Sequence, residues 1–236
     1  MADRPKPAYG TPNWEMIGRW LHLEPDDDGP FWALNLMKYH PVAHYADGTS
    51  AVSGREADDA YAPLGPLAAI VAAVAFHGDV LDQRLGEPAW DRVGIVRYPS
   101  RAAFFAMQQR DDFKAQHVHK EAGMEFTIVM ACLPTSYDAD ATSDGSLVLI
   151  VERDASDPAT SVAGATEVAS FAVEGVIVGD DRSFDRARFI RAADEDVVAA
   201  LVETASASND AHVLVVDPAI DHLVETIVTA PTAPAS

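Results

Sequence analysis

The order of predicted secondary-structure elements occurs twice along this chain, and this repetition constrains the fold more than any other feature. Alternating apolar residues bounded by turn residues predict strands, and apolar residues at helical spacing predict helices. Residues 31–132 give the order strand, helix, strand, strand, helix, strand, and residues 146–217 give it again. Sheets of this kind carry helices on one face only, so two of them tend to close on each other by their bare faces. The space between them is a natural place for a small molecule.

Local signals set the boundaries of these elements. Strands are predicted at 31–39, 78–84, 92–98 and 125–132 in the first half, and at 147–153, 173–178, 186–191 and 212–217 in the second. Helices are predicted at 54–75, over 100–123 in two pieces, and at 159–170, 194–207 and 221–228. Pro63 and Pro66 should kink the first of these helices. Ser100 should cap the second at its start, and Gly123 should end it.

Four segments follow from this order of elements. Residues 1–133 hold an N-terminal arm, a short helix and the first unit, and residues 134–145 form a linker rich in Asp, Ser, Thr and Ala. Residues 146–230 hold a second, shorter unit, and residues 231–236 are expected to be a disordered tail. Thr11 and Pro12 predict the N-cap and first position of the short N-terminal helix, which carries Trp14 and Trp20.

Three stretches of the first half carry a resemblance to a known superfamily. They are Leu34-Asn35-Leu36-Met37-Lys38-Tyr39, the run from Trp90-Asp91-Arg92-Val93 into Arg97-Tyr98-Pro99-Ser100-Arg101, and His119-Lys120-Glu121-Ala122-Gly123-Met124. Through them, residues 31–133 resemble a small, largely uncharacterised branch of the dimeric α/β-barrel superfamily. The resemblance implies an α+β fold of two ferredoxin-like units, here in tandem, whose antiparallel sheets pack as an α/β barrel. It leaves the reaction open, because the superfamily includes cofactor-independent oxygenases, haem enzymes, isomerases and proteins of no known activity.

The composition is that of an acidic globular protein. The 236 residues, 48% of them hydrophobic, are enough to bury a core. The formal charge of -20 argues against nucleic acid or an anionic membrane as a partner, because no basic stripe is present. No apolar run reaches membrane-spanning length and no signal peptide begins the chain, so we expect a cytoplasmic protein. The single cysteine, Cys132, lies in an apolar strand and is interpreted as a core residue.

Three polar side chains interrupt otherwise apolar strand faces: Asn35, Arg97 and Thr127. A buried polar group costs free energy unless it is paired, so these side chains either satisfy one another and nearby loops or contact a ligand. In the structural interpretation, Arg97 pairs with Glu125 or Asp91 or reaches the sheet edge. In the functional interpretation, Arg97 stabilises developing negative charge, Asn35 orients an oxygen atom, and Thr127 is a further ligand contact.

Histidines gather in the first half of the chain. His40 and His44 lie in a turn-rich loop after the first strand, and an imidazole there suits acid–base chemistry because it titrates near neutrality. His119 belongs to the family-like helix end, where it either caps the helix or faces the pocket. Pro41 breaks the helical spacing between His40 and His44, so no metal site is predicted.

We expect the ligand between loop 40–48 and the barrel face that carries Asn35 and Arg97. Tyr39 and Tyr45, which flank the loop histidines, should contribute ligand contacts. No cofactor is expected, because the chain has no phosphate-binding glycine loop, dinucleotide fingerprint or paired-cysteine motif.

Two classes of function stay open at this stage. The first is an enzyme that acts on an oxygenated, partly apolar small molecule without bound nucleotide or metal, of the oxygenase, isomerase or lyase type, with a first-half histidine as base. The second is a non-catalytic ligand-binding or assembly protein whose barrel is filled by side chains. A haem protein is a further alternative by resemblance to tandem relatives, although neither His212 nor His222 lies in a stretch like a haem-ligating helix. Edge strands and the N-terminal helix predict a homodimer.

Overall fold

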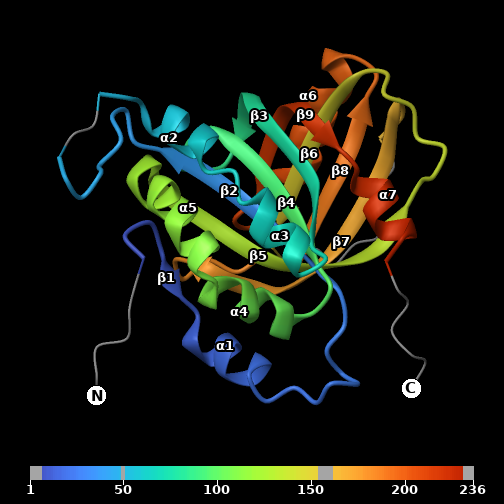
Figure 1. The fold of residues 1–236 in the computed structure, drawn as a ribbon. Coiled ribbons are helices and arrows are strands. Elements are labelled where there is room, and N and C mark those ends of the chain that lie inside the picture. The colour runs from blue at the N-terminus through green and yellow to red at the C-terminus, as the bar shows by residue number, and fades with distance from the viewer. Residues whose placement is uncertain (1–6, 49–50, 154–161, 231–236) are drawn as a thin grey trace.

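The computed structural model describes residues 7–48, 51–153 and 162–230, and strands make up most of its centre (Figure 1). The first half contributes strands β2 (Phe31–Tyr39), β3 (Ala73–Leu85), β4 (Arg92–Tyr98) and β5 (Met124–Tyr137). The second half contributes β6 (Ser146–Glu152), β7 (Ala165–Gly179), β8 (Arg186–Ala192) and β9 (His212–Asp221). A short strand, β1 (Thr11–Pro12), pairs with β7.

These strands form one antiparallel sheet that closes into a barrel within the single chain. The order is β7-β5-β2-β4-β3-β9-β6-β8, and β8 then pairs with β7 to complete the circle. Each half contributes four neighbouring strands, β5-β2-β4-β3 and β9-β6-β8-β7. The two halves join edge to edge, through β3 with β9 and β5 with β7. Closure therefore pairs strand edges that either half alone would leave open.

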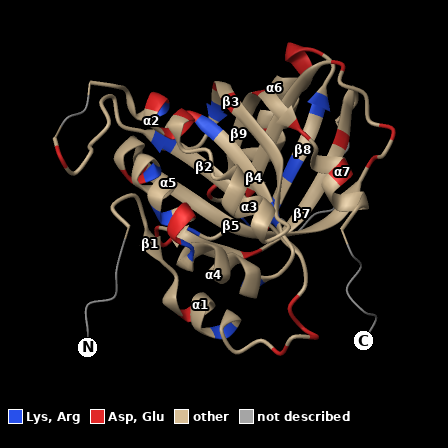
Figure 2. Ribbon diagram, in the orientation of Figure 1, with Lys and Arg blue, Asp and Glu red and all other residues tan. Residues whose placement is uncertain are grey.

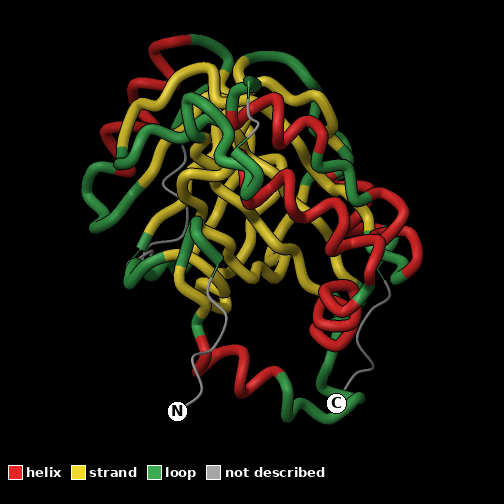
Figure 3. The backbone as a smooth tube through the Cα atoms, turned by 60° about the vertical axis from the view of Figure 1, so that its left-hand side comes forward, coloured by secondary structure: helices red, strands yellow, loops and turns green. Residues whose placement is uncertain are grey.

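Helices surround the barrel on its outer face (Figure 3). The helices of the first half are α2 (Gly54–Ala60), α3 (Leu64–Ala69), α4 (Arg101–Gln109) and α5 (Asp111–Gly123). The remaining helices are α1 (Trp14–Trp20), α6 (Glu195–Ala205) and α7 (Leu223–Val228). Figure 1 shows α2 to α5 along the strands of the first half and α6 beside those of the second. Among the described residues, no helix is both long and apolar enough to cross a membrane.

The interior of the barrel is filled by apolar side chains. Strand β2 points Trp32, Leu34 and Leu36 inward, as the strict alternation of a strand requires, and all three are at most 1% exposed. Every strand from β2 to β9 adds residues to the same cluster. Helix α7 covers one end, where Trp32 Nε1 donates to Thr226 Oγ1 at 3.0 Å. The space that the sequence suggested for a ligand is thus occupied by the protein core.

Cys132 belongs to this interior cluster, as the sequence predicted. It is 1% exposed, and burial raises the pKa of its thiol to about 12. The thiol therefore stays protonated near neutral pH, which confirms a packing role rather than a nucleophilic one.

The sequence-based prediction was wrong at the first helix of the second half. Residues 165–170, predicted as the end of a helix, belong to the long strand β7, while residues 159–161 lie outside the described part of the chain. The sequence there is rich in Ala, Thr and Glu, which are compatible with a helix. Strand β7 hydrogen-bonds to both β5 and β8, and this tertiary pairing overrides the local preference.

Smaller differences concern three boundaries. Thr11 and Pro12 form β1, and Asn13 caps α1 through its side chain, which accepts from Met16 N. The predicted helix 54–75 divides into α2 and α3 at Pro63, while Pro66 is accommodated in the first turn of α3, and β3 already begins at Ala73. Strand β5 continues to Tyr137, so the first four residues of the predicted linker extend the sheet that joins the two halves.

The end of the barrel opposite α7 is closed by a buried histidine. His212 is 2% exposed, and its Nδ1 accepts from Trp90 Nε1 at 3.3 Å. Burial, together with the charge of Arg182, lowers the pKa of His212 to about 4. As the pH falls below 6.5, the histidine of the unfolded chain is protonated while the buried one is still neutral. The free energy of unfolding that His212 contributes above pH 6.5 is therefore lost as the pH falls towards 4.

We predict that His212→Asn flattens the acid dependence of stability. The change removes the titrating ring and keeps an acceptor for Trp90, so the loss of unfolding free energy between pH 7 and pH 4.5 should shrink by about 2 to 3 kcal/mol. Urea unfolding at the two pH values measures it, with exposed His22→Asn as the control. An unchanged acid dependence in His212→Asn would contradict the assignment.

Candidate functional site

A cavity of about 240 Å³ lies on the outer face of the first-half sheet, beneath α2, α3 and α5. Its floor is a row of three residues in register across neighbouring strands, Asn35 on β2, Gly94 on β4 and His77 on β3. Gly94 provides the space, because a Cβ atom there would meet only Met37 Cε, at 3.1 Å. A glycine inside a strand often marks a site where a ligand or another backbone approaches the sheet closely.

The roof of the cavity comes from the segment that connects α2 to α3. Tyr61 ends α2 in an extended conformation, and Pro63, Leu64 and Leu67 follow it over the cavity. The side walls are mostly apolar and include Val74, Phe76, Ile95, Val96 and Tyr98. This combination of an apolar lining with a few polar groups is typical of small-molecule sites.

Two glycines set the height of this roof. The ideal Cβ position of Gly54, at the start of α2, lies within 2.5 Å of backbone oxygens of His40 and Gly123. That of Gly123, at the end of α5, lies within 2.3 Å of Gly54 O. The helices α2 and α5 can therefore touch only with glycine at both positions, and this contact places Asp58 and Lys120 at the cavity.

Asp58 is the buried acidic group of the site, 7% exposed. Its Oδ2 accepts from Tyr39 Oη at 2.5 Å and from Arg92 Nη1 at 3.1 Å. Arg92 also donates to Asp59 at 2.7 Å and to Asp79 at 2.9 Å. Burial and the neighbouring Asp58 charge raise the pKa of Tyr39 far above its usual range, so the phenol remains a neutral donor.

Lys120 is the cationic group of the site and has weak partners. Its Nζ lies 3.5 Å from Asn35 Oδ1, and the rings of Tyr9 and Tyr61 flank it at 5.7 Å from Nζ to each ring centroid. Within the described part of the chain it forms no ion pair. Burial lowers the pKa of Lys120, although the charge of Asp58 acts in the opposite direction. A lysine held in this way has a larger neutral, nucleophilic fraction than an exposed one.

His117 completes the surroundings of Tyr9. Its Nε2 lies 3.0 Å from Tyr9 Oη, and its ring stacks on Phe113. Burial, with a contribution from the Lys120 charge, lowers the pKa of His117 to about 4. The imidazole is therefore neutral at pH 7 and holds the Tyr9 ring beside the amine without adding charge.

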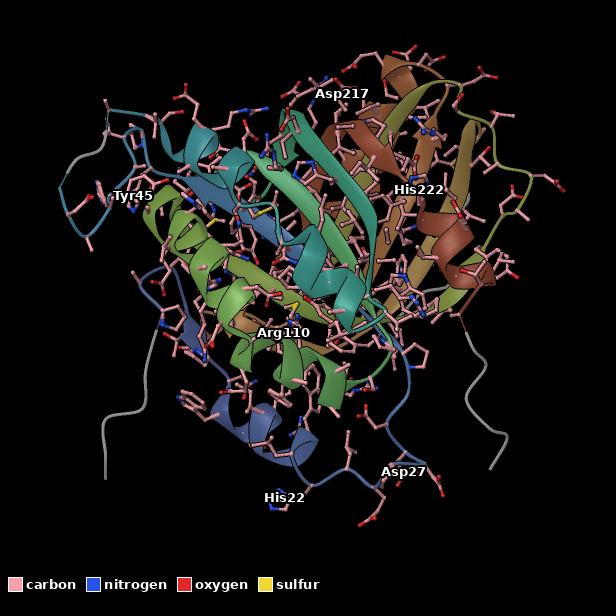
Figure 4. The ribbon with its side chains drawn as sticks, viewed as in Figure 1. His22, Asp27, Tyr45, Arg110, Asp217 and His222 are labelled. Carbon is pink, nitrogen blue, oxygen red and sulfur yellow. The ribbon has the colours of Figure 1, made fainter. Side chains whose placement is uncertain are left out.

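The three predicted catalytic histidines gather outside the cavity. The rings of His40 and His44 lie 4.0 Å apart by their centroids, and His119 Nδ1 lies 2.7 Å from Tyr45 Oη. Figure 4 shows Tyr45 on the loop beyond one end of α5, with Arg110 near the other end. The loop 40–48 thus brings these four side chains together at the C-terminal end of α5, while none of them lines the cavity.

The other four predicted residues have separate places. Asn35 lines the cavity, and Tyr39 is bonded to Asp58 beneath the roof. Thr127 is fully buried and donates from Oγ1 to Leu36 O at 2.7 Å. Arg97 donates to Val71 O at 3.2 Å, at the turn that follows α3.

Asn35 and Arg97 do not share a barrel face, contrary to the prediction. The strand partner of Asn35 is Gly94, and Arg97 stands three residues further along β4, opposite Trp32. Side chains alternate between the two faces of a strand, and Arg97 is three positions from Gly94. Arg97 therefore lies on the inner face with Trp32, and Asn35 lies on the outer face. The joint role expected for the two side chains therefore does not follow.

Sequence reasoning missed Lys120, Asp58, His77 and Gly94. A signal existed for Gly94, since an isolated glycine in an apolar strand indicates space or a close approach. Lys120 lies inside the family-like helix end His119–Met124, where His119 is the residue that the sequence predicts for the site. Asp58 gives no sequence signal, because its role depends on Arg92, which is 34 residues away.

The histidines of the second half do not suit a haem at this cavity. His212 is packed against Trp90 at the barrel end, and His222 pairs with Glu225 at 3.1 Å beside α7, where Figure 4 shows it. Neither lines the cavity. In the described ranges, no three His, Cys, Asp or Glu side chains are arranged to hold a metal ion.

Comparisons with known proteins add neighbours of unknown function. No protein-family profile matches the chain, and no curated protein matches it. A crystal structure of the methylated RPA0582 protein is similar with a TM-score of 0.48 and 26% identity, over 55% of this chain and 97% of that chain. A second structure, of the RPA0582 protein of unknown function from Rhodopseudomonas palustris, gives 0.47 and 26%, over 55% and 98%.

We predict that Lys120→Met stabilises the protein at pH 7. Burial disfavours the charged amine in the folded state, and methionine keeps the length of the apolar stem without the charge. The urea midpoint should rise, and the gain should shrink between pH 7 and pH 10, because the unfolded lysine binds more protons than the folded one in that range. Lys114→Met, on the exposed part of α5, is the matched control and should show neither effect. A lower midpoint for Lys120→Met would show that the amine is a net stabiliser.

Proposed function

We propose that this protein is an enzyme that acts on a compact, partly apolar molecule carrying an oxygen function, bound in the outer-face cavity without nucleotide or metal. The observation that carries the proposal is the Lys120 amine, weakly partnered at the edge of an otherwise apolar space above Gly94. A half-buried amine that forms no ion pair with the described residues is expected to lower stability, so its presence is better explained by chemistry than by packing.

The size and lining of the cavity define the ligand class. At about 240 Å³, the space is below the range of roughly 300–1,000 Å³ typical of drug-sized ligands. It suits a molecule about the size of a single substituted ring. The Lys120 amine on α5 reaches Asn35 at the edge of the floor, so the amine and the Asn35 amide can both donate to one oxygen atom of the ligand.

Neutral groups around the cavity fit proton transfer or nucleophilic attack by the protein itself. Tyr61 keeps its proton, since burial raises the pKa of its phenol well above the usual range. Burial lowers the pKa of His77 on the floor, so its imidazole is available as a base near neutral pH. These groups support an isomerase or lyase type of reaction through Lys120 or His77, with an oxygenase type as the remaining member of the class.

We also propose that the two halves are ferredoxin-like units in tandem. Within β5-β2-β4-β3 the strands of the first half stand in the order fourth, first, third, second, and β9-β6-β8-β7 repeats that order. The α2–α3 segment and α4–α5 occupy the two helical positions of the first unit, and α6 occupies the second position of the other.

A non-catalytic ligand-binding protein is the second candidate. The packed interior of the barrel favours it, because the space between the sheets offers no room for a substrate. Under this proposal the outer-face cavity binds the same class of molecule and leaves it unchanged. Turnover of bound molecules distinguishes the two candidates.

We predict that Gly94→Leu abolishes ligand binding and leaves the fold intact. The new side chain would fill the cavity, and its Cβ would displace only the flexible end of Met37, so stability should change by less than about 2 kcal/mol. Saturation-transfer NMR with acetophenone and benzamide measures binding. The control is Gly18→Ala on α1, where a Cβ has open space. Equal binding by wild type and Gly94→Leu would place the ligand elsewhere.

Self-association as a homodimer stays a prediction. Acidic side chains spread over the loops and helices in Figure 2. Helix α1 and the segment after it nevertheless expose Trp14, Leu21 and Leu23, which are 38%, 63% and 37% exposed. Burial of such apolar side chains against a second copy is favourable. Light scattering should give twice the mass of 25.3 kDa, and Leu21→Glu should return it to the single-chain value. A wild-type mass of 25.3 kDa in dilute solution would contradict the prediction.

A further inference from the structure

The Lys120 amine keeps most of its hydrogen-bonding capacity unused at the edge of the cavity. Its one polar contact among the described residues is Asn35 Oδ1 at 3.5 Å, near the outer limit of a hydrogen bond. Tyr9 and Tyr61 hold the end of the side chain between their rings. The amine thus faces the cavity with a fixed direction and with free hydrogen-bonding capacity.

We propose that Lys120 forms an imine with a neutral aldehyde or ketone bound above Gly94. This inference rests on the proposed function and names its substrate class. The cavity supplies apolar walls for a ring. Asn35 Nδ2 donates one hydrogen to Ala33 O at 3.0 Å, and its second hydrogen can hold the carbonyl oxygen of the ligand. The carbonyl carbon then lies beside the amine.

The covalent step balances within the protein and its ligand. The nitrogen lone pair of the neutral amine attacks the carbonyl carbon, a C–N bond forms, and the carbonyl oxygen takes up the proton that the nitrogen loses. The carbinolamine then loses its hydroxyl together with the remaining nitrogen proton as water, as the remaining C–O bond breaks, and leaves a neutral imine. The imine nitrogen takes up one proton from solvent to give the iminium. No oxidant or reductant is needed.

The groups packed around Lys120 support this step. The amine faces Tyr9 before β1, Asp58 and Tyr61 on or at the end of α2, Asn35 on β2, and His117 on its own helix. Burial raises the pKa of both tyrosines, so both phenols stay neutral near pH 7. Neither of them supplies a negative charge next to the iminium. Burial also lowers the pKa of the amine itself, and the Asp58 carboxylate is the anion that can balance the iminium charge.

The same carboxylate defines the specificity. When Lys120 is neutral, Asp58 is the charged group among the residues that line the cavity, because burial lowers the pKa of His77. Arg92 offsets this charge only in part, because it is shared with Asp59 and Asp79. A substrate that carries its own carboxylate would be repelled by Asp58. The cavity therefore favours neutral carbonyl compounds over oxo acids.

Reductive trapping tests the inference. The protein is incubated at pH 7 with benzaldehyde and sodium cyanoborohydride, and the modified lysines are mapped by peptide mass spectrometry. We expect Lys120 to be modified at least roughly tenfold faster than exposed Lys114 on the same helix, because the cavity orients the carbonyl. The Lys114→Arg variant should keep the fast modification, and Gly94→Leu should lose it. With 4-carboxybenzaldehyde the reaction at Lys120 should be slower.

Equal rates at Lys120 and Lys114 would overturn the proposal, as would fast modification of Lys120 in Gly94→Leu. A faster reaction with 4-carboxybenzaldehyde would overturn the specificity argument. Acetophenone binding separates this failure from that of the proposed function. If acetophenone binds wild type and not Gly94→Leu while benzaldehyde traps no lysine preferentially, the cavity is a ligand site and the imine is wrong. Fast trapping at Lys120 that is absent in Lys120→Arg supports the imine directly.

Discussion

The edge-to-edge pairing of the two half-sheets determines where everything else in this protein can lie. Strand β3 pairs with β9 and β5 pairs with β7, so among the described strands no long edge of either half is left open. The apolar faces turn inward and fill the barrel with one continuous cluster. Because this interior is packed, the ligand site that we propose is the cavity on the outer face, between the strands of the first half and the helices α2, α3 and α5.

The outer face has room at the place where one strand position lacks a side chain. Gly94 stands between Asn35 and His77, and the contact of Gly54 with Gly123 keeps the roof close above. Three glycines therefore produce the cavity, because each lacks a side chain that would fill it or push the helices away. Larger side chains at Gly54 or Gly123 would push the helices apart, and one at Gly94 would fill the floor.

The polar groups of the site divide into a satisfied set and an unsatisfied one. Asp58, Tyr39 and Arg92 form a network in which each side chain has a partner, which fixes α2 against the sheet. Lys120, on the neighbouring helix α5, forms no ion pair with the described residues, and its hydrogen bond to Asn35 is long, at 3.5 Å. Groups that the fold leaves without a partner are concentrated at functional sites, because activity needs groups that the fold itself has not neutralised.

The sequence by itself determined the strands of the first half, the alternation of β2, the capping at Ser100 and the buried state of Cys132, because these depend on neighbouring residues along the chain. It also gave Asn35 as a polar residue that needs a partner. It did not give the face on which the ligand space lies, which depends on how completely the barrel interior is filled.

Only the tertiary structure decided the remaining features, because they depend on strand register and on contacts between distant segments. The register placed Asn35 and Arg97 on opposite faces, and long-range pairing made β7 a strand. The contact between α2 and α5 brought Asp58 near the Lys120 amine, which is 62 residues further along the chain. Periodicity along a chain tells which residues share a face, while packing across the molecule decides which faces meet.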